Sequence, residues 1–238
     1  MNTKALLGVS LLCSSVFSAT DTQIINYFKS QIPVPTIQIE VTSRVNIDNV
    51  EGGLEYVTLN ISDGQRAQEL SVFTKDNLIF PDVININDGG SIKEKLDRDK
   101  LIKNLSKIYK EEDPKNILMV GNDSKKETLV VFTDPECPFC NKEVQKIEQR
   151  LETYNLKLIF TPVHDRSSLE KSVLILKQAS NLQDTKEQVK IIQKYFNGDV
   201  DAKVSDEEVQ NIQNLISKYF SAGIKGVPFI VNEKDLLN

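Results

Sequence analysis

Residues 132–140 read FTDPECPFC, and they follow an apolar run, Leu129–Phe132, that predicts a buried strand. Residues 138–154 carry apolar side chains on one face, which predicts a helix. Cys137 and Cys140 are therefore expected where a strand ends and a helix begins. At that position, unpaired backbone N–H groups and the helix dipole favour a thiolate at the first cysteine.

The spacing of the two cysteines predicts a redox pair. Because the thiolate is the nucleophile, Cys137 is expected to attack, and Cys140, one turn further into the helix, to resolve the mixed disulfide. Pro138 suits the first helical turn, where its missing N–H would have had no partner. Two alternatives stay open: an inert structural disulfide, or half of a zinc site completed by a second subunit. A disulfide around so short a loop constrains the unfolded chain little, so its stabilising effect would be small.

Three ionisable residues near the motif are assigned no catalytic role. His164 follows the next predicted strand and is interpreted as a surface histidine at a loop end, rather than as a base for thiol exchange. Asp134 and Glu136 flank the motif, and a carboxylate close to a thiolate opposes its formation. We therefore predict that both acids are solvated.

The second half of the chain predicts an α/β domain over residues 114–238. Short apolar runs predict strands at residues 117–120, 156–163 and 229–231. Residues 167–222 show helical periodicity without a strand pattern, which indicates a helical insertion.

Residues 20–88 predict a small antiparallel sheet with a leading helix over residues 21–30. Beyond that helix, apolar and polar residues alternate in short segments, and Asp63-Gly64 and Asp76-Asn77 supply turn signals. Val83, Ile84 and Ile86 are expected to end the run of strands. A domain of about seventy residues has a modest core and commonly gains stability by pairing with a copy of itself.

A further helix is expected between the two halves, over residues 93–109, with Ser91 as its N-cap. Glycines precede this helix and Pro114 follows it closely, so residues 89–113 are interpreted as a linker between two domains. An ordinary packed helix is the alternative.

Residues 1–19 predict a secretory signal peptide, with basic Lys4, an apolar stretch and small residues near the end. Cys13 lacks the small preceding residue of a lipoprotein signal, because Leu12 stands there. If Cys13 leaves with this segment, two cysteines remain, and export delivers them to an oxidising compartment.

The composition limits the possible partners. A hydrophobic content of 39% can form a core, which argues against a wholly disordered chain. The formal net charge of −5 argues against nucleic acid as a partner. Three cysteines and one histidine are too few for a disulfide framework or an ordinary one-chain zinc site, so no metal is expected.

Residues 132–140, the helical insertion and Gly226-Val227-Pro228 resemble the thioredoxin-fold thiol-disulfide interchange proteins of the bacterial periplasm. The dimeric DsbC/DsbG-type family is the most similar, because residues 70–80 (LSVFTKDNLIF) resemble its small dimerisation domain. The resemblance implies an α+β protein with an N-terminal dimerisation domain, a linker helix and a C-terminal thioredoxin-like domain that carries the insertion.

The resemblance also implies a function. The protein would be a periplasmic homodimer that acts on unfolded or misoxidised exported proteins and exchanges electrons with a membrane redox partner. The cysteine pair would be the redox group, without a metal or organic cofactor. Pro228 would be the family's cis-proline beside the CxxC motif, and Val227, Pro138 and Phe139 would contact the substrate.

The chain departs from the family pattern in ways that leave the direction of the reaction open. Pro138-Phe139 is nearer to the Pro-Tyr of DsbG-like members than to the Gly-Tyr of isomerases or the Pro-His of strong oxidases. Val227 is more typical of oxidases, whereas isomerases usually carry threonine there. Oxidation, isomerisation and reduction all stay open.

Two further points are open at this stage. The chain ends at Asn238, before the additional strand and helix of a usual thioredoxin fold, so a truncated C-terminus is one interpretation. The competing functional class is a non-catalytic periplasmic chaperone or scaffold, which would keep its activity after both cysteines were replaced by serine.

Overall fold

The computed structural model describes residues 19–48, 53–87, 89–198, 200 and 203–238. The predicted signal peptide, including Cys13, lies outside the described residues except for Ala19. The chain divides into two compact units, one up to Asp97 and one from Arg98 onwards. None of the helices in the described part of the chain is long and apolar enough to cross a membrane.

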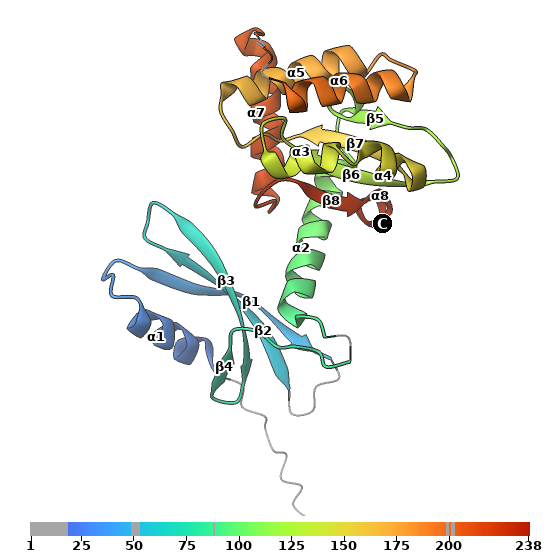
Figure 1. Ribbon diagram of the computed structural model, residues 1–238. Helices are drawn as coiled ribbons and strands as arrows, with labels where there is room; N and C mark the ends of the chain where they lie inside the picture. Colours follow the sequence, from blue (N-terminus) through green and yellow to red (C-terminus); the bar gives the residue numbers. More distant parts are fainter. Residues whose placement is uncertain (1–18, 49–52, 88, 199, 201–202) are drawn as a thin grey trace, which may run out of the picture. The chain divides into compact units, whose positions relative to one another are not determined.

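The first unit begins with helix α1 (Asp21–Gln31), followed by a four-stranded antiparallel sheet (Figure 1). The strands lie in their order along the chain and are β1 (Gln38–Ile47), β2 (Leu54–Ser62), β3 (Ala67–Lys75) and β4 (Leu78–Phe80). The antiparallel sheet predicted from the alternating pattern is therefore confirmed.

The two faces of this sheet bury different sets of side chains. α1 begins with a capping box between Thr20 and Gln23, and its Ile24 packs into the larger cluster with Ile39, Val57, Leu59 and Val72. The other face carries a smaller cluster formed by Leu54, Tyr56 and Phe73, with Ile92 and Leu96 packed against it.

The turns of this unit follow the sequence signals, but its last predicted strand does not form. β3 and β4 join through Asp76 and Asn77, and Asp76 adopts a left-handed backbone with φ 51°. The expected strand at Val83–Ile86 is wrong, because Ile84 forms an isolated bridge to Ser91 and Ile86 is 93% exposed. A loop closed by hydrogen bonds between Asn85 and the two glycines at 89 and 90 folds this segment back on itself.

The second unit contains a mixed four-stranded sheet. Its strands are β5 (Leu118–Val120), β6 (Glu127–Thr133), β7 (Tyr154–Phe160) and β8 (Phe229–Asn232), in the order β5-β7-β6-β8. The central strands β6 and β7 are parallel, whereas β5 and β8 pair antiparallel at the two edges. The end of β6 therefore lies inside the sheet, between β7 and β8.

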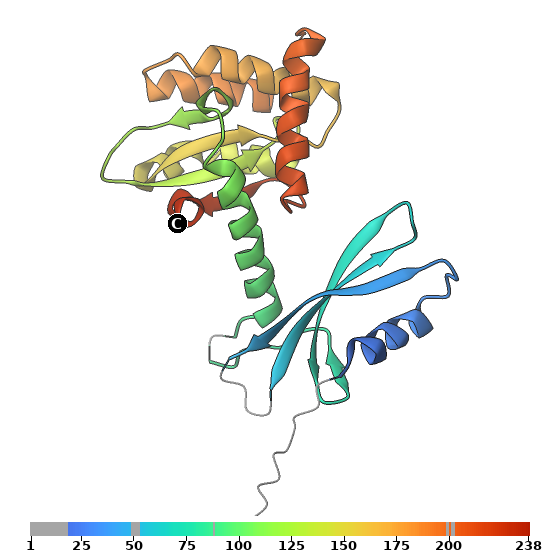
Figure 2. The ribbon, with the colours of Figure 1, turned by 180° about the vertical axis from the view of Figure 1, so that it is seen from behind.

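Helices cover both faces of this sheet. α3 (Pro138–Val144) and α4 (Ile147–Thr153) lie on one face (Figure 1), and α7 (Asp206–Ser221) lies on the other (Figure 2). On the α7 side, the ring of Phe132 packs against Tyr219 and Phe229, and all of Phe132 and Tyr219 is buried. α5 (Arg166–Ala179) and α6 (Thr185–Asn197) pack against each other, so three helices fill the segment between β7 and β8.

Further helices complete the described chain. α2 (Ile92–Tyr109) contains the division between the two units, and its Leu105 and Tyr109 are buried in the core of the second unit. A short 3-10 helix, η1 (Pro114–Asn116), precedes β5, and α8 (Glu233–Leu237) follows β8.

The prediction of one continuous helix over residues 138–154 is wrong. The helix is broken between α3 and α4, where Lys146 leaves the helical region with φ −98° and ψ 7°. The Lys146 N–H bonds to the Glu143 carbonyl, one residue closer than in a regular α-helix. Neither glycine nor proline stands at the break, so the sequence contains no local signal for it.

Candidate active site around Cys137 and Cys140

Cys137 lies where a strand gives way to a helix. β6 ends at Thr133, a turn closes with a 3.2 Å hydrogen bond from the Cys137 N–H to the Asp134 carbonyl, and Cys137 is the N-cap of α3. Pro138 is the first helical residue, and the Asn141 N–H donates to the Cys137 carbonyl at 2.9 Å. The predicted position of the cysteine pair is therefore confirmed.

The two thiols have different environments. Both cysteines are free, and Cys137 is 5% exposed whereas Cys140 is fully buried. Burial raises the pKa of the Cys140 thiol to about 12, although hydrogen bonds from the Thr133 hydroxyl and the Asp134 N–H act in the opposite direction. Cys140 therefore holds its proton at neutral pH, and Cys137 is the less deeply buried of the two cysteines.

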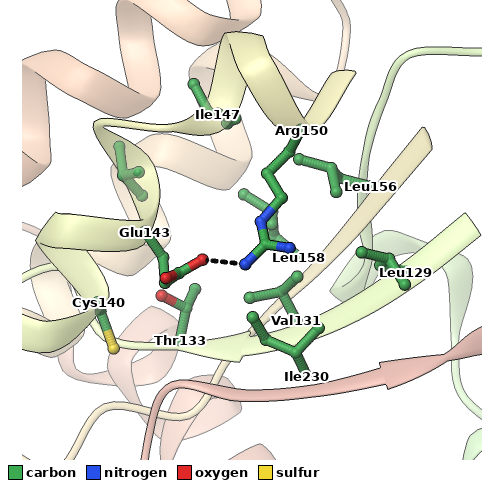
Figure 3. A pocket seen from close by; sticks show the side chains of 11 residues that line it. Leu129, Val131, Thr133, Cys140, Glu143, Ile147, Arg150, Leu156, Leu158 and Ile230 are labelled. Atoms are coloured by element: carbon green, nitrogen blue, oxygen red, sulfur yellow. Dashed lines mark hydrogen bonds and ion pairs between the residues drawn. The ribbon is translucent and has the colours of Figure 1, made fainter. Parts of the chain in front are cut away.

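A small cavity lies between α3, α4 and the sheet, next to Cys140 (Figure 3). Its volume of about 30 Å³ leaves room for about one water molecule. The lining is mostly aliphatic, and its charged members are Glu143 and Arg150, which form an ion pair of 2.6 Å. The Arg150 guanidinium holds the pKa of Glu143 below its ordinary value despite partial burial.

The loop before β8 brings a second chain segment to Cys137. β8 pairs with β6, which sets Phe229 opposite Phe132, and the Val227–Pro228 peptide just before it is cis. The Cys137 Sγ–H donates to the Val227 carbonyl at 3.6 Å. Four of the predicted site residues, Cys137, Cys140, Val227 and Pro228, thus meet at one end of the sheet.

The two residues between the cysteines face solvent. Pro138 is exposed, and Phe139 is 67% exposed with the Lys142 ammonium 5.4 Å from its ring centre. An exposed aromatic ring is a surface that an apolar peptide segment can cover.

The expectation that Asp134 is solvated is wrong, because its side chain is fully buried. Its carboxylate accepts hydrogen bonds from the Glu136 N–H (2.8 Å), the Val163 N–H (2.9 Å), the His164 ring at Nδ1 (2.6 Å) and the Ser168 hydroxyl. A carboxylate can be buried in this way because the donors replace its water shell.

These contacts change the pKa of both partners. Burial alone would raise the pKa of Asp134, but the hydrogen bonds from His164, Ser168 and two backbone N–H groups outweigh it and hold that pKa below the ordinary value. The hydrogen bond to Asp134 raises the pKa of His164 above its ordinary value.

The prediction for Glu136 needs correction as well, whereas the predicted place of His164 on the surface is confirmed. The side chain of Glu136 is not simply solvated, since it pairs at 2.9 Å with Lys171, which is 7% exposed. His164 does lie at a loop end with its side chain 42% exposed, but its ring is bonded to a buried carboxylate. Strand periodicity could not have indicated Asp134, because residues 130–135 are all buried and burial does not alternate along this stretch. The sequence contains no signal for its partner His164 either, thirty positions later in the chain.

A metal site is not visible in the described part of the chain, where no three or more His, Cys, Asp or Glu side chains are grouped to hold an ion.

Comparison with known proteins supports the fold. No family model and no curated protein matches the sequence. The solved structure of Helicobacter pylori DsbG matches 89% of this chain and 99% of that chain, with a TM-score of 0.51 and 17% sequence identity. A linker-deletion mutant of Proteus mirabilis ScsC matches 58% of this chain and 77% of its own, with a TM-score of 0.41 and 19% identity. The thiol-disulfide exchange protein alpha-DsbA2 of Wolbachia pipientis matches 57% and 86%, with a TM-score of 0.38 and 20% identity.

At these identities the likeness to DsbG is a likeness of fold. The α+β fold class expected from the resemblance to the DsbC/DsbG-type family is confirmed.

Proposed function

We propose that this protein is a thiol-disulfide oxidoreductase that forms or isomerises disulfides in exported proteins through Cys137 and Cys140. One observation carries the proposal: Cys137, 5% exposed, stands at the N-cap of α3, and a second, protonated cysteine is fully buried one turn behind it. The exposed backbone N–H groups and dipole at a helix N-terminus favour a thiolate at the first position.

The exchange reaction needs no group beyond these two sulfurs. The Cys137 thiolate attacks one sulfur of a substrate disulfide, which forms a mixed disulfide and releases the other substrate sulfur as a thiolate. Cys140 then loses its proton to solvent and attacks the Cys137 sulfur, which leaves a Cys137–Cys140 disulfide and a reduced substrate. The reverse sequence oxidises a substrate dithiol, because every step conserves one disulfide bond.

The burial of Cys140 supports a slow second step. Burial raises the pKa of the Cys140 thiol, so its thiolate is a minor form at neutral pH. The Thr133 hydroxyl and the Asp134 N–H are the donors that stabilise the charge when Cys140 does ionise. A mixed disulfide that persists gives a free thiolate of the same substrate time to attack it, and that rearrangement is isomerisation.

Substrate contact is assigned to the residues around Cys137. The Val227 carbonyl already accepts a hydrogen bond from the Cys137 sulfur, so the same stretch of backbone lies where a bound peptide would pass. Pro138 and Phe139 are exposed beside it and supply apolar contact. Unfolded or misoxidised proteins offer the apolar segments that such a surface binds.

The cellular setting belongs to the same proposal. The predicted signal peptide and the single CxxC pair support action in the periplasm, where a membrane redox partner would restore the working oxidation state. The small first unit supports a homodimer, since a sheet with so modest a core gains stability by pairing.

The decisive experiment is a covalent trap. Cys140→Ser, in its reduced form, is expected to accumulate mixed disulfides with a scrambled model protein such as ribonuclease A, visible as a mass increase that dithiothreitol removes. Cys137→Ser and the double serine variant are the matched controls and should form none. Exchange that survives in Cys137→Ser, or reactivation of the scrambled substrate by the double variant, would contradict the proposal.

A further inference from the structure

Asp134 connects three separate parts of the second unit just before Cys137. Its carboxylate accepts from the Glu136 N–H in the loop that leads to Cys137. It also accepts from the Val163 N–H and the His164 ring in the loop after β7, and from Ser168 in the first turn of α5. Its own carbonyl accepts from the Cys137 N–H at 3.2 Å. Asp134 therefore fixes the turn that carries Cys137 through two groups, its side-chain carboxylate and its backbone carbonyl.

This arrangement places two negative charges within three residues of the sulfur that must itself become negative. A nearby carboxylate disfavours a thiolate, and the effect is stronger where water is excluded. Each of the two acids has its own basic partner. Glu136 pairs with Lys171, whereas Asp134 pairs with His164, and histidine is the residue type whose charge changes within the physiological pH range.

The other charged groups around His164 are paired or belong to the same loop. Asp165 follows it directly, and Asp134 and Glu136 face it from the loop before α3. From α5, Lys171 is held by Glu136, and Arg166 is held by Glu170 and by Asp206 of α7. Asp134 is thus the group that the imidazolium of His164 neutralises most directly, at 2.6 Å.

We propose that Asp134 and His164 are a positioning pair for Cys137: the buried carboxylate fixes the turn that presents the sulfur, and the protonated imidazole cancels its charge so that the thiolate can form. The pair rests on the proposed function, because it serves the attack by Cys137. It couples the reactivity of that sulfur to the protonation of one residue outside the CxxC motif. Exchange at mildly acidic pH is then faster than it would be with a neutral residue at position 164.

The first test compares two substitutions at His164 in the full-length protein. An asparagine amide nitrogen can occupy nearly the place of the imidazole Nδ1, so His164→Asn keeps the hydrogen-bond donor but loses the charge. His164→Ala loses both. Ser168→Ala is the matched control, because it removes another hydrogen bond from the same carboxylate without changing any charge.

The readout is the rate of iodoacetamide alkylation at Cys137 in the reduced proteins between pH 5.5 and 9. We expect His164→Asn to react about three- to tenfold more slowly than the wild type at pH 6, with the difference vanishing by pH 9 as His164 of the wild type becomes neutral. Ser168→Ala should keep the shape of the wild-type profile. A His164→Asn profile that superimposes on that of the wild type would overturn the proposal.

The second test needs no substitution, since His164 is the one histidine of the sequence. Its ring protons can be titrated by NMR in the reduced and the oxidised protein. Coupling between two sites is reciprocal, so an imidazolium that favours the Cys137 thiolate must itself be favoured by that thiolate. We expect a higher titration midpoint in the reduced protein, and equal midpoints in both redox states would also overturn the proposal.

These measurements separate the pair from the proposed function. Alkylation and the histidine titration report on the thiolate without requiring a protein substrate. If the Cys140→Ser variant forms mixed disulfides but the His164 variants keep the wild-type pH profile of alkylation, only the proposal of a positioning pair is contradicted. Shifted profiles with no mixed disulfide would remove the oxidoreductase function alone.

Discussion

The two units of the chain bury different kinds of side chains. In the first unit the buried clusters are aliphatic or aromatic, and the buried polar side chains described there are the uncharged Thr58, Ser71 and Thr74. The second unit buries charges as well, among them Asp134 and Lys171. Glu112 is a third buried charge: 3% of its side chain is exposed, and its carboxylate contacts Lys218 and Tyr219.

This difference supports the proposed site in the second unit. A buried charge destabilises a fold unless it is paired and hydrogen-bonded, so it persists where another role maintains it. Two of the three buried charges contact the residues just before Cys137. Both units leave some large apolar side chains exposed; those of the first unit include Val45, Leu78, Ile84 and Ile86.

The largest expected effect concerns association. If the protein is the proposed homodimer, removal of residues 20–88 should give a monomer that exchanges disulfides with small thiols within about twofold of the full chain. Reactivation of a scrambled protein should fall at least about tenfold, because a substrate held by two subunits benefits from a high effective concentration. Analytical ultracentrifugation and a refolding assay measure the two properties. A full-length monomer at micromolar concentration would remove the proposed role of the first unit.

Core truncations should separate the units energetically. Phe73→Ala in the first unit and Phe132→Ala in the second each remove a fully buried ring, at a cost of about 3–5 kcal/mol of unfolding free energy. Scanning calorimetry should show one transition lowered in each variant. Phe73→Ala is expected to retain exchange with small thiols. Phe132→Ala is expected to lose this exchange at a lower temperature than the wild type does. A single transition lowered equally by both would contradict two separate cores.

Acid should weaken the second unit more than the first. The pKa values of Asp134 and Glu112 are lowered: for each of them burial acts to raise the pKa, but hydrogen bonds led by His164 and Lys218 outweigh it. A carboxylate with a lowered pKa contributes stability above its unfolded-state pKa and loses that stability as the pH falls through the folded-state value, here below about pH 4.

The loss should be about 1–3 kcal/mol for each of these carboxylates, the usual value of hydrogen bonds to a buried charged group. Asp63 and Asp82 of the first unit also have lowered pKa values, but both are exposed. Between pH 7 and pH 3, calorimetry should therefore show a steeper fall in the midpoint temperature of the second unit than in that of the first. Asp134→Asn should make the midpoint temperature of the second unit less dependent on pH. Parallel falls of both midpoint temperatures would contradict the expectation that acid weakens the second unit more than the first.

The smallest expected effect is that of Val227→Thr. The contact with Cys137 is made by the backbone carbonyl, which threonine keeps, and the side chains are nearly the same size. We expect exchange rates to change by no more than about threefold and stability to fall by about 1 kcal/mol or less. Assays of oxidation and isomerisation in parallel would detect a shift in their balance. A tenfold change would indicate that the side chain itself contacts the substrate or the sulfur.

Local patterns were sufficient for much of the fold. Alternating residues predicted the antiparallel sheet of the first unit, and apolar runs predicted β5 to β8 within a few residues. These predictions succeed because the period of a strand or helix is repeated along the chain itself. The break at Gln145 and Lys146 could not be predicted in this way, because no residue there disfavours a helix on its own.

The position of the cysteine pair and the predicted order of attack followed from residues 132–140 alone, since a strand end, a proline and a helix start are neighbours in sequence. The environment of Cys137 could not be derived from those residues. Asp134 is buried because Val163, His164 and Ser168 supply its hydrogen bonds from about thirty positions away, and Lys171 reaches Glu136 from α5. Whether a carboxylate is solvated or buried is decided by the donors around it in space, and those donors come together only when β7 and α5 pack beside β6.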